Sequence, residues 1–324
     1  MSEDNQADNT CCCASCGTAE VDDIKLMDCD GCDLVKYCSD ECQQLHRPEH
    51  EEECKKRVAE LRDELLFKQP ESSHRGDCPI CTLPLYGANF VLTSCCFKSI
   101  CQGCSFGVNR NTCPFCREPV PKTEEDRDKL RMKRIEANDP VALRQEGGVQ
   151  NKKGEYRSAF EYYTKAAELG DVEAHYELSF LYHDGKGVEK DEEKTLYHTE
   201  EAAIGGHPHA RFLLGCLECY NGQQVVAKGL ATIIRPGDDL STKWEWEEKN
   251  HRHYERAVKH WIIAAAQGED DAIETLMKKF KHGFLEREVL ATALRAHHAA
   301  VDATKSLQRK AAEDWSRMKK EAKG

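Results

Sequence analysis

The sequence predicts a mostly α-helical protein in which two small cysteine-rich modules precede an α-solenoid of helix-pair repeats. Seventeen of the 19 cysteines lie before residue 117, and only Cys216 and Cys219 follow. Beyond Lys122 the chain is rich in Glu, Lys, Arg and Ala, and an Ala-Ala-x2-Gly pattern recurs there. The cysteines therefore place the first domain boundary near residue 117, and the recurring pattern indicates stacked helices beyond it.

Composition narrows the class of protein. A chain of 324 residues with 40% apolar and 32% charged residues favours two or three folded domains. The first twenty residues lack the basic start and apolar run of a secretory signal, so we expect a cytoplasmic or nuclear protein without disulfides. No apolar stretch approaches the roughly 18 residues that cross a bilayer. The formal net charge of -12 argues against nucleic acid as a partner.

The first module contains eight candidate metal ligands within about forty residues. They form four pairs at metal-ligand spacing: Cys13 and Cys16, Cys29 and Cys32, Cys38 and Cys42, His50 and Cys54. Eight ligands make two tetrahedral zinc sites, and a segment this short needs the metal to fold. Cys11 and Cys12 could shift the first ligand by one, but only Cys13 gives the two-residue spacing. We prefer His50 to His46 because it lies four residues before Cys54.

These pairs, with Tyr37-Cys38-Ser39 and Cys42-Gln43, resemble the MYND-type zinc finger over residues 13–54. The resemblance implies an interleaved arrangement. One zinc would bind Cys13, Cys16, Cys38 and Cys42, and the other Cys29, Cys32, His50 and Cys54.

A second cysteine cluster runs from Cys78-Pro79-Ile80-Cys81 to Cys113-Pro114-Phe115-Cys116-Arg117. The pairs between them are Cys95-Cys96 and Cys101-x2-Cys104, so there are again eight candidate ligands. The end motifs resemble an all-cysteine RING finger, with Lys98 near the place of the usual ligand histidine. That resemblance implies one zinc on Cys78, Cys81, Cys101 and Cys104, and another on Cys95, Cys96, Cys113 and Cys116. Adjacent cysteines chelate awkwardly, so one of Cys95 and Cys96 could instead be a buried thiol.

The RING resemblance also implies two contact residues. The residue at the place of Ile80 contacts a ubiquitin-conjugating enzyme, and a basic residue at the place of Arg117 holds the donor ubiquitin. Such a module orients a thioester and supplies no nucleophile, so no catalytic residue is assigned. The alternative is that Ile80 packs the small core and Arg117 is a solvated side chain.

The helical remainder repeats with a period of 36 residues and one insertion of 26. Small residues mark it at three positions: Ala166, Ala202 and Ala264; Ala174, Ala210 and Ala272; Gly170, Gly206 and Gly268. Each unit is expected to be two helices, with small residues allowing close packing and the glycine ending a helix. With Leu181-Tyr182-His183-Asp184-Gly185-Lys186-Gly187, these positions resemble Sel-one-like repeats, relatives of the tetratricopeptide repeat. The order of all three modules resembles a family of predicted algal proteins.

The expected boundaries are a disordered tail at 1–12, the first finger at 13–54, a helical linker at 55–77 and the RING-like finger at 78–117. A charged helical connector follows at 118–137, then the repeats at 138–302 with an insertion near 223–250, and a charged capping helix at 303–324. Cys216, Cys219, His297 and His298 are expected to be core or helix-surface residues rather than ligands. Trp244 and Trp246 either bind a partner or cover the repeat groove.

Two function classes remain open. One is a RING-type ubiquitin ligase or adaptor holding four zinc ions, in which the repeats recruit proteins and the second finger recruits a conjugating enzyme. The other is a non-catalytic scaffold or transcription cofactor that uses both fingers as docking surfaces. A lysine methyltransferase is not expected, because its cofactor-binding and catalytic segments need residues that the repeats occupy.

Overall fold

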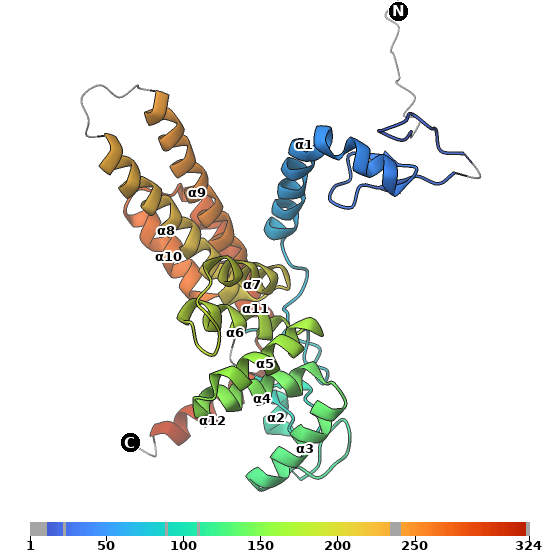
Figure 1. Ribbon diagram of the computed structural model, residues 1–324. Coiled ribbons are helices and arrows are strands. Elements are labelled where there is room, and N and C mark those ends of the chain that lie inside the picture. The colour runs from blue at the N-terminus through green and yellow to red at the C-terminus, as the bar shows by residue number, and fades with distance from the viewer. Residues whose placement is uncertain (1–11, 22–23, 88–89, 109–110, 234–240, 322–324) are drawn as a thin grey trace, which may run out of the picture. The chain divides into compact units, whose positions relative to one another are not determined.

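The computed structural model (Figure 1) describes residues 12–21, 24–87, 90–108, 111–233 and 241–321, except for the side chains of 221–250 and 320. The chain forms two compact units, Met1–Lys68 and Gln69–Gly324. Each is described separately below. No helix in the described ranges combines the length and apolar character needed to cross a membrane.

The first unit is a small finger joined to one long helix. Strands β1 (Met27–Asp28) and β2 (Lys36–Tyr37) pair antiparallel, and α1 (Asp40–Phe67) follows. The Ser39 side chain accepts a hydrogen bond from the Cys42 N–H and so caps the helix. The helix continues through Pro48, so the short helix expected after Cys54 is the second half of α1.

The second finger belongs to the larger unit. Strands β3 (Phe90–Leu92) and β4 (Ser99–Cys101) form a hairpin with Val91 opposite Ile100, and the short helix α2 (Gln102–Gly107) follows. Its small core consists of ligand cysteines with Leu85 and Ile100, and Phe90 and Phe115 pack against it.

The repeats form a chain of helices in which each packs on the next. They are α3 (Glu124–Glu136), α4 (Pro140–Lys153), α5 (Tyr156–Glu168), α6 (Val172–Asp184), α7 (Glu192–Ile204), α8 (Pro208–Ile233), α9 (Ser241–Ala266), α10 (Asp270–Lys281) and α11 (Arg287–Ala303). The predicted small positions at the helix contacts, such as Ala166, Ala202 and Ala264, are fully buried. Gly170, Gly206 and Gly268 all have positive φ, as the predicted helix ends require.

In the part of the insertion that the structure describes, two neighbouring helices are lengthened. Helices α8 and α9 each have 26 residues and lie against one another, and both are longer than the other repeat helices (Figure 1). Residues 234–240, and the side chains of Trp244 and Trp246, lie outside the described part.

The last helix packs against the second finger. Helix α12 (Leu307–Glu321) packs on α2 of the second finger, and the hydroxyl of the preceding Ser306 accepts the Arg309 N–H. The ring of Trp315 lies 5.7 Å from that of Phe106. The charged C-terminal helix expected at 303–324 therefore contacts the second finger as well as following the repeats in the chain.

Candidate zinc centres

Three tight turns present the paired cysteines in the same way. In each turn the carbonyl of the first cysteine accepts the N–H of the residue four positions later, at Gly17, Thr82 and Arg117, with distances of 2.9, 2.7 and 3.1 Å. All three of these residues have positive φ, although only one is glycine. The Cys-x2-Cys spacing therefore produces a local turn that directs two thiols to one point.

The first centre joins the opening turn to the start of α1. Cys13, Cys16, Cys38 and Cys42 converge. The Sγ atoms of Cys16 and Cys38 are 3.5 Å apart, and those of Cys38 and Cys42 are 3.6 Å apart. Cys12 is exposed and lies outside the group, and Cys11 lies outside the described residues.

The second centre of this finger contains its histidine. Cys29, Cys32, His50 and Cys54 converge, with 3.1 Å between Cys32 Sγ and His50 Nε2 and 3.8 Å between the Sγ atoms of Cys29 and Cys54. His46 instead bonds to the Tyr37 hydroxyl through Nδ1 at 3.0 Å and stacks on His50. The helical spacing of His50 and Cys54 thus brings both to one face of α1.

The third centre forms at the base of α2. Cys78, Cys81, Cys101 and Cys104 converge, and the Sγ atoms of Cys81 and Cys101 are 3.8 Å apart. Backbone N–H groups point at these sulfurs: Cys101 donates to Cys78 at 3.4 Å and Cys104 to Cys101 at 3.3 Å.

The fourth centre includes both adjacent cysteines. Cys95 Sγ lies 3.2 Å from Cys116 Sγ, and Cys96 Sγ lies 3.7 Å from Cys113 Sγ. A turn closed by the Phe97 N–H on the Thr93 carbonyl, with Phe97 at positive φ, presents the two neighbours together. Lys98, near the place of the missing histidine, lies over the Phe115 ring.

Each centre holds at least one thiol that ionises more easily than usual. In the first centre, hydrogen bonds from Thr18 lower the pKa of the exposed Cys16. Each centre also holds a less exposed thiol with a lowered pKa, at Cys13, Cys29, Cys78 or Cys113. Burial alone would raise their pKa, but hydrogen bonds from backbone N–H groups lower it, to about 6 for Cys13 and about 7 for Cys78 and Cys113. Zinc binds thiolates, so these turns prepare a first ligand for the metal.

The donor sets fit zinc. A tetrahedral site with Zn–S of about 2.3 Å separates its sulfurs by about 3.8 Å, and the sulfur pairs above lie between 3.2 and 3.8 Å apart. The eighteen cysteines that the structure describes are all free. A bound zinc would supply a fixed cross-link in each finger, which four converging thiol or imidazole ligands can hold.

The two residues implied as ubiquitin-system contacts are both free of the core. Ile80 is 41% exposed in the first turn of the second finger and is not among its core residues. Arg117 is exposed and has a φ of 61°. Ile80 therefore does not pack the core of the finger, contrary to that part of the alternative. Arg117 keeps a left-handed backbone conformation, which costs a non-glycine residue about 1 kcal/mol.

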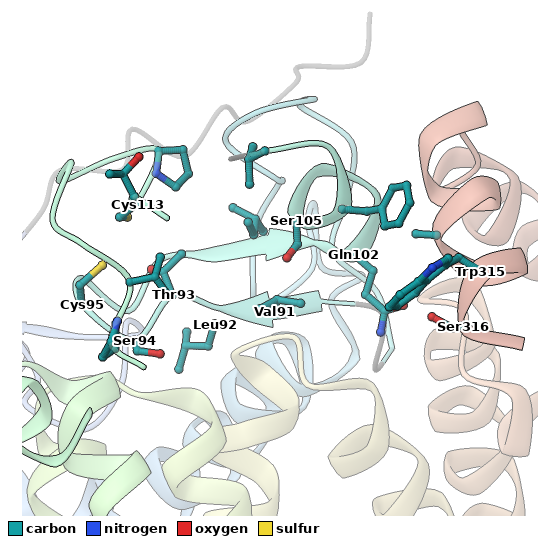
Figure 2. Close-up of a pocket in the computed structure, with 18 residues that line it drawn as sticks. Val91, Leu92, Thr93, Ser94, Cys95, Gln102, Ser105, Cys113, Trp315 and Ser316 are labelled. Atoms are coloured by element: carbon teal, nitrogen blue, oxygen red, sulfur yellow. The ribbon is translucent and has the colours of Figure 1, made fainter. Parts of the chain in front are cut away.

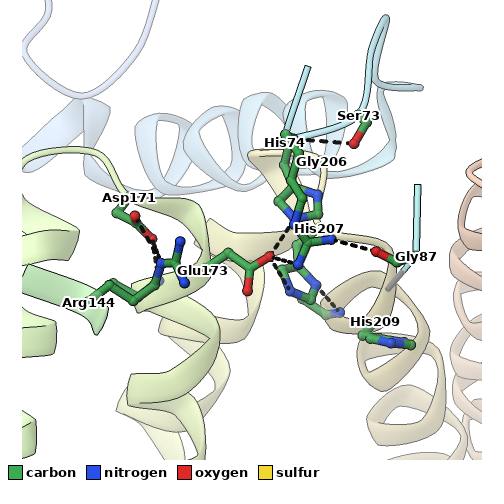
Figure 3. A network of polar contacts seen from close by, with 12 residues as sticks. Ser73, His74, Gly87, Arg144, Asp171, Glu173, Gly206, His207 and His209 are labelled. Atoms are coloured by element: carbon green, nitrogen blue, oxygen red, sulfur yellow. Dashed lines mark hydrogen bonds and ion pairs between the residues drawn. The ribbon is translucent and has the colours of Figure 1, made fainter. Parts of the chain in front are cut away.

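The structure also contains a histidine–glutamate cluster that the sequence analysis missed (Figure 3). His74, from the segment before the second finger, lies 2.7 Å from Glu173 Oε1 on α6, and His207 lies 3.8 Å from the same oxygen. Arg75 pairs with that oxygen too. The Nδ1 of His207 accepts the Ala210 N–H, so its Nε2 carries the proton and faces Glu173.

This cluster is better explained as an ion-pair network than as a metal site. A divalent cation beside Glu173 would have to displace the Arg75 guanidinium and the proton of His207. Burial alone would raise the pKa of Glu173, but hydrogen bonds from His207 and His74 and the charge of Arg75 hold it well below its ordinary value. The network fastens residues 69–77 to the repeats; these residues are not helical, so the linker expected at 55–77 is a helix only up to Phe67.

The remaining candidate residues have structural partners. Cys216 packs on the core beside Trp261, and Lys279 donates to Cys219 Sγ at 3.8 Å. His297 Nε2 lies 3.0 Å from Asp270 Oδ1. None of the ligand groups found in the described ranges includes these residues or His298.

Comparisons with known proteins identify two of the three modules. Residues 13–54 match the MYND finger model, and residues 144–171, 172–207 and 249–269 match the Sel1 repeat model. The chain therefore contains a zinc-binding MYND finger followed by Sel1 repeats, the class of repeat that generally mediates protein–protein interaction. The RING identity of the second finger stays a prediction.

Solved structures with Sel1-type folds are also similar. A Sel1 repeat protein from Oxalobacter formigenes is 21% identical, with a TM-score of 0.29, over 61% of this chain and 94% of that one. A protective antigen from uropathogenic Escherichia coli with an SLR fold is 19% identical, with a TM-score of 0.32, over 62% of this chain and 52% of that one. No curated protein matched the chain.

Proposed function

We propose that this protein holds four zinc ions, recruits proteins through its Sel1 repeats and uses its second finger as a RING-type ubiquitin ligase surface. Its general role as a zinc-binding interaction scaffold follows from the MYND finger and the repeats. The ion count rests on the four converging ligand groups. Elemental analysis giving two ions per chain would remove one finger from the proposal.

One observation carries the ligase proposal. The second finger presents Ile80 and Arg117 to solvent, at the two turns where RING fingers contact a conjugating enzyme and its ubiquitin. Arg117 stays in a left-handed conformation that a glycine would adopt more easily. The exposure of both side chains supports a role in contacting another protein, as catalysis by positioning requires.

Exposed apolar side chains on the repeats offer a place for the recruited protein. Phe180, Leu196 and Tyr197 on α6 and α7 are 39, 41 and 51% exposed. Aromatic and aliphatic side chains of this kind anchor protein interfaces.

A second candidate function is a non-catalytic scaffold. It is favoured by the packing of the second finger, since α12 covers part of α2 and the network at Glu173 fastens the preceding segment to the repeats. In this role both fingers would serve only as docking surfaces.

Ubiquitin discharge from a panel of loaded conjugating enzymes separates the two functions. We expect Ile80→Ala and Arg117→Gly to abolish discharge that the zinc-loaded protein supports. Arg117→Gly removes the guanidinium without straining the turn, because φ at this position suits glycine.

Two matched variants control the experiment. Thr82→Gly changes the equivalent left-handed position of the first turn, and Val120→Ala shortens another exposed aliphatic side chain of the finger. Both should retain discharge. A zinc-loaded protein that discharges no enzyme in the panel would reject the ligase function and leave the scaffold.

A further inference from the structure

The guanidinium of Arg309 on α12 is buried against the third centre. Its Nη1 donates to the Pro84 carbonyl at 2.9 Å, and its Nη2 donates to the Leu83 carbonyl at 3.1 Å. Nη2 also lies 3.7 Å from Cys81 Sγ. The residue is only 8% exposed.

This buried positive charge has no carboxylate partner among the described residues. Burying an unpaired charge costs several kcal/mol. Four thiolates around one Zn²⁺ leave two negative charges in the third centre. A zinc-loaded third centre would therefore supply a counter-charge for Arg309.

The backbones of α2 and α12 also touch beside this centre. A Cβ built on Gly103 would lie 2.6 Å from the backbone nitrogen of Arg309 and 2.8 Å from the carbonyl carbon of Gln308. Gly103 lies between the ligands Cys101 and Cys104. Its φ is not positive, unlike that of the glycines in the turns. A glycine is needed here by the approach of α12, and not by the turn that holds the metal.

Helix α12 also completes an apolar cavity on this finger (Figure 2). Trp315 from α12 lines a cavity of about 420 Å³ together with Val91 and Phe106 of the finger, and Figure 2 labels Val91 and Trp315 in its wall. Movement of α12 away from α2 would remove the wall of this cavity that Ala312, Trp315 and Ser316 form.

We propose that Arg309 is the counter-ion of the third zinc centre and that zinc binding there is thermodynamically linked to the docking of α12. Bound zinc would hold the helix because it keeps the four cysteines ionised, and their net negative charge faces Arg309. By reciprocity the docked helix tightens the zinc by the same factor. The inference rests on zinc occupying the second finger, as proposed above.

The test titrates the zinc-loaded full-length protein with a chelator and reads each cysteine by alkylation and mass spectrometry. This readout separates the third centre from the MYND finger. In Arg309→Gln we expect the chelator to expose the four ligands of the third centre at a concentration at least about 10-fold lower than in the unmodified protein. These ligands are Cys78, Cys81, Cys101 and Cys104. Arg309→Lys should restore part of the loss. Arg317→Gln is the matched control, since Arg317 lies on the same helix but pairs only with Asp314 in an exposed site.

A second pair of variants tests the helix contact without changing charge. Gly103→Ala should weaken zinc retention as Arg309→Gln does, whereas Gly107→Ala, which has open space at its Cβ, should not. In the reciprocal experiment, chelation should release the amides of residues 307–321 to hydrogen exchange.

The outcomes are distinct. If Arg309→Gln and Arg317→Gln retain zinc equally, or if α12 stays protected after the third centre loses its metal, the linkage is wrong although the zinc site stands. If the cysteines of the unmodified protein react at once and only two zinc ions are found, the zinc proposal for this finger fails and the linkage fails with it.

Discussion

Replacement of Glu173 by Gln should destabilise the larger unit strongly. The Glu173 side chain is 17% exposed, and its carboxylate pairs with His74, His207 and Arg75. Glutamine leaves the Arg75 charge in place without its partner. Breaking a buried pair in this way costs about 3 kcal/mol, which lowers Tm by about 6–12 °C for a unit of this size.

Glu177 provides a matched control one turn along α6. Burial, and then the charge of Glu173, raise the pKa of Glu177, so its ionised form is a cost in the folded state. Glu177→Gln should therefore leave the stability at pH 7 unchanged or increase it slightly. The two substitutions make the same chemical change and are expected to have different effects.

Tryptophan fluorescence is a suitable assay because all four tryptophans lie in the larger unit. The folded pKa of Glu173 lies below its unfolded value of about 4.5. Its stabilisation is therefore present above that pH and is lost as the pH falls through the folded pKa. The difference in Tm between the unmodified protein and Glu173→Gln should shrink on acidification. Equal Tm losses for Glu173→Gln and Glu177→Gln at pH 7 would refute the ion-pair network.

Three further predictions concern folding. Leu214→Ala should cost about 2–5 kcal/mol by urea denaturation, because this side chain is 2% exposed between repeat helices; a loss below 1 kcal/mol would contradict the packing. Gly187→Ala should lower Tm more than Gly283→Ala. Both positions have positive φ, but only at Gly187 would the new Cβ overlap the Tyr156 backbone; equal losses would contradict that contact. Chelation of zinc should abolish hydrogen-exchange protection in residues 13–54, and persisting protection would mean that the finger folds without metal.

The local parts of this architecture followed from the sequence. Cys-x2-Cys spacing and helical spacing on α1 predicted the ligand groups, because each pair is brought together by one turn or one helix face. The repeat register was equally readable, since small residues such as Ala202 recur wherever helices approach closely. The spacing could not decide whether both Cys95 and Cys96 join a centre, and the left-handed Phe97 turn places both there.

Contacts between distant segments were decided by the tertiary structure. Arg309 reaches Leu83 across 226 residues, and His74 reaches Glu173 across 99. Neither pair has a periodicity or spacing that marks it in the sequence, because a long chain can bring almost any two surface segments together at small additional entropic cost. The sequence by itself therefore determined the MYND finger, the other cysteine ligand groups and the repeats. Only the folded chain decided that α12 completes the second finger and that this finger is fastened to the repeats.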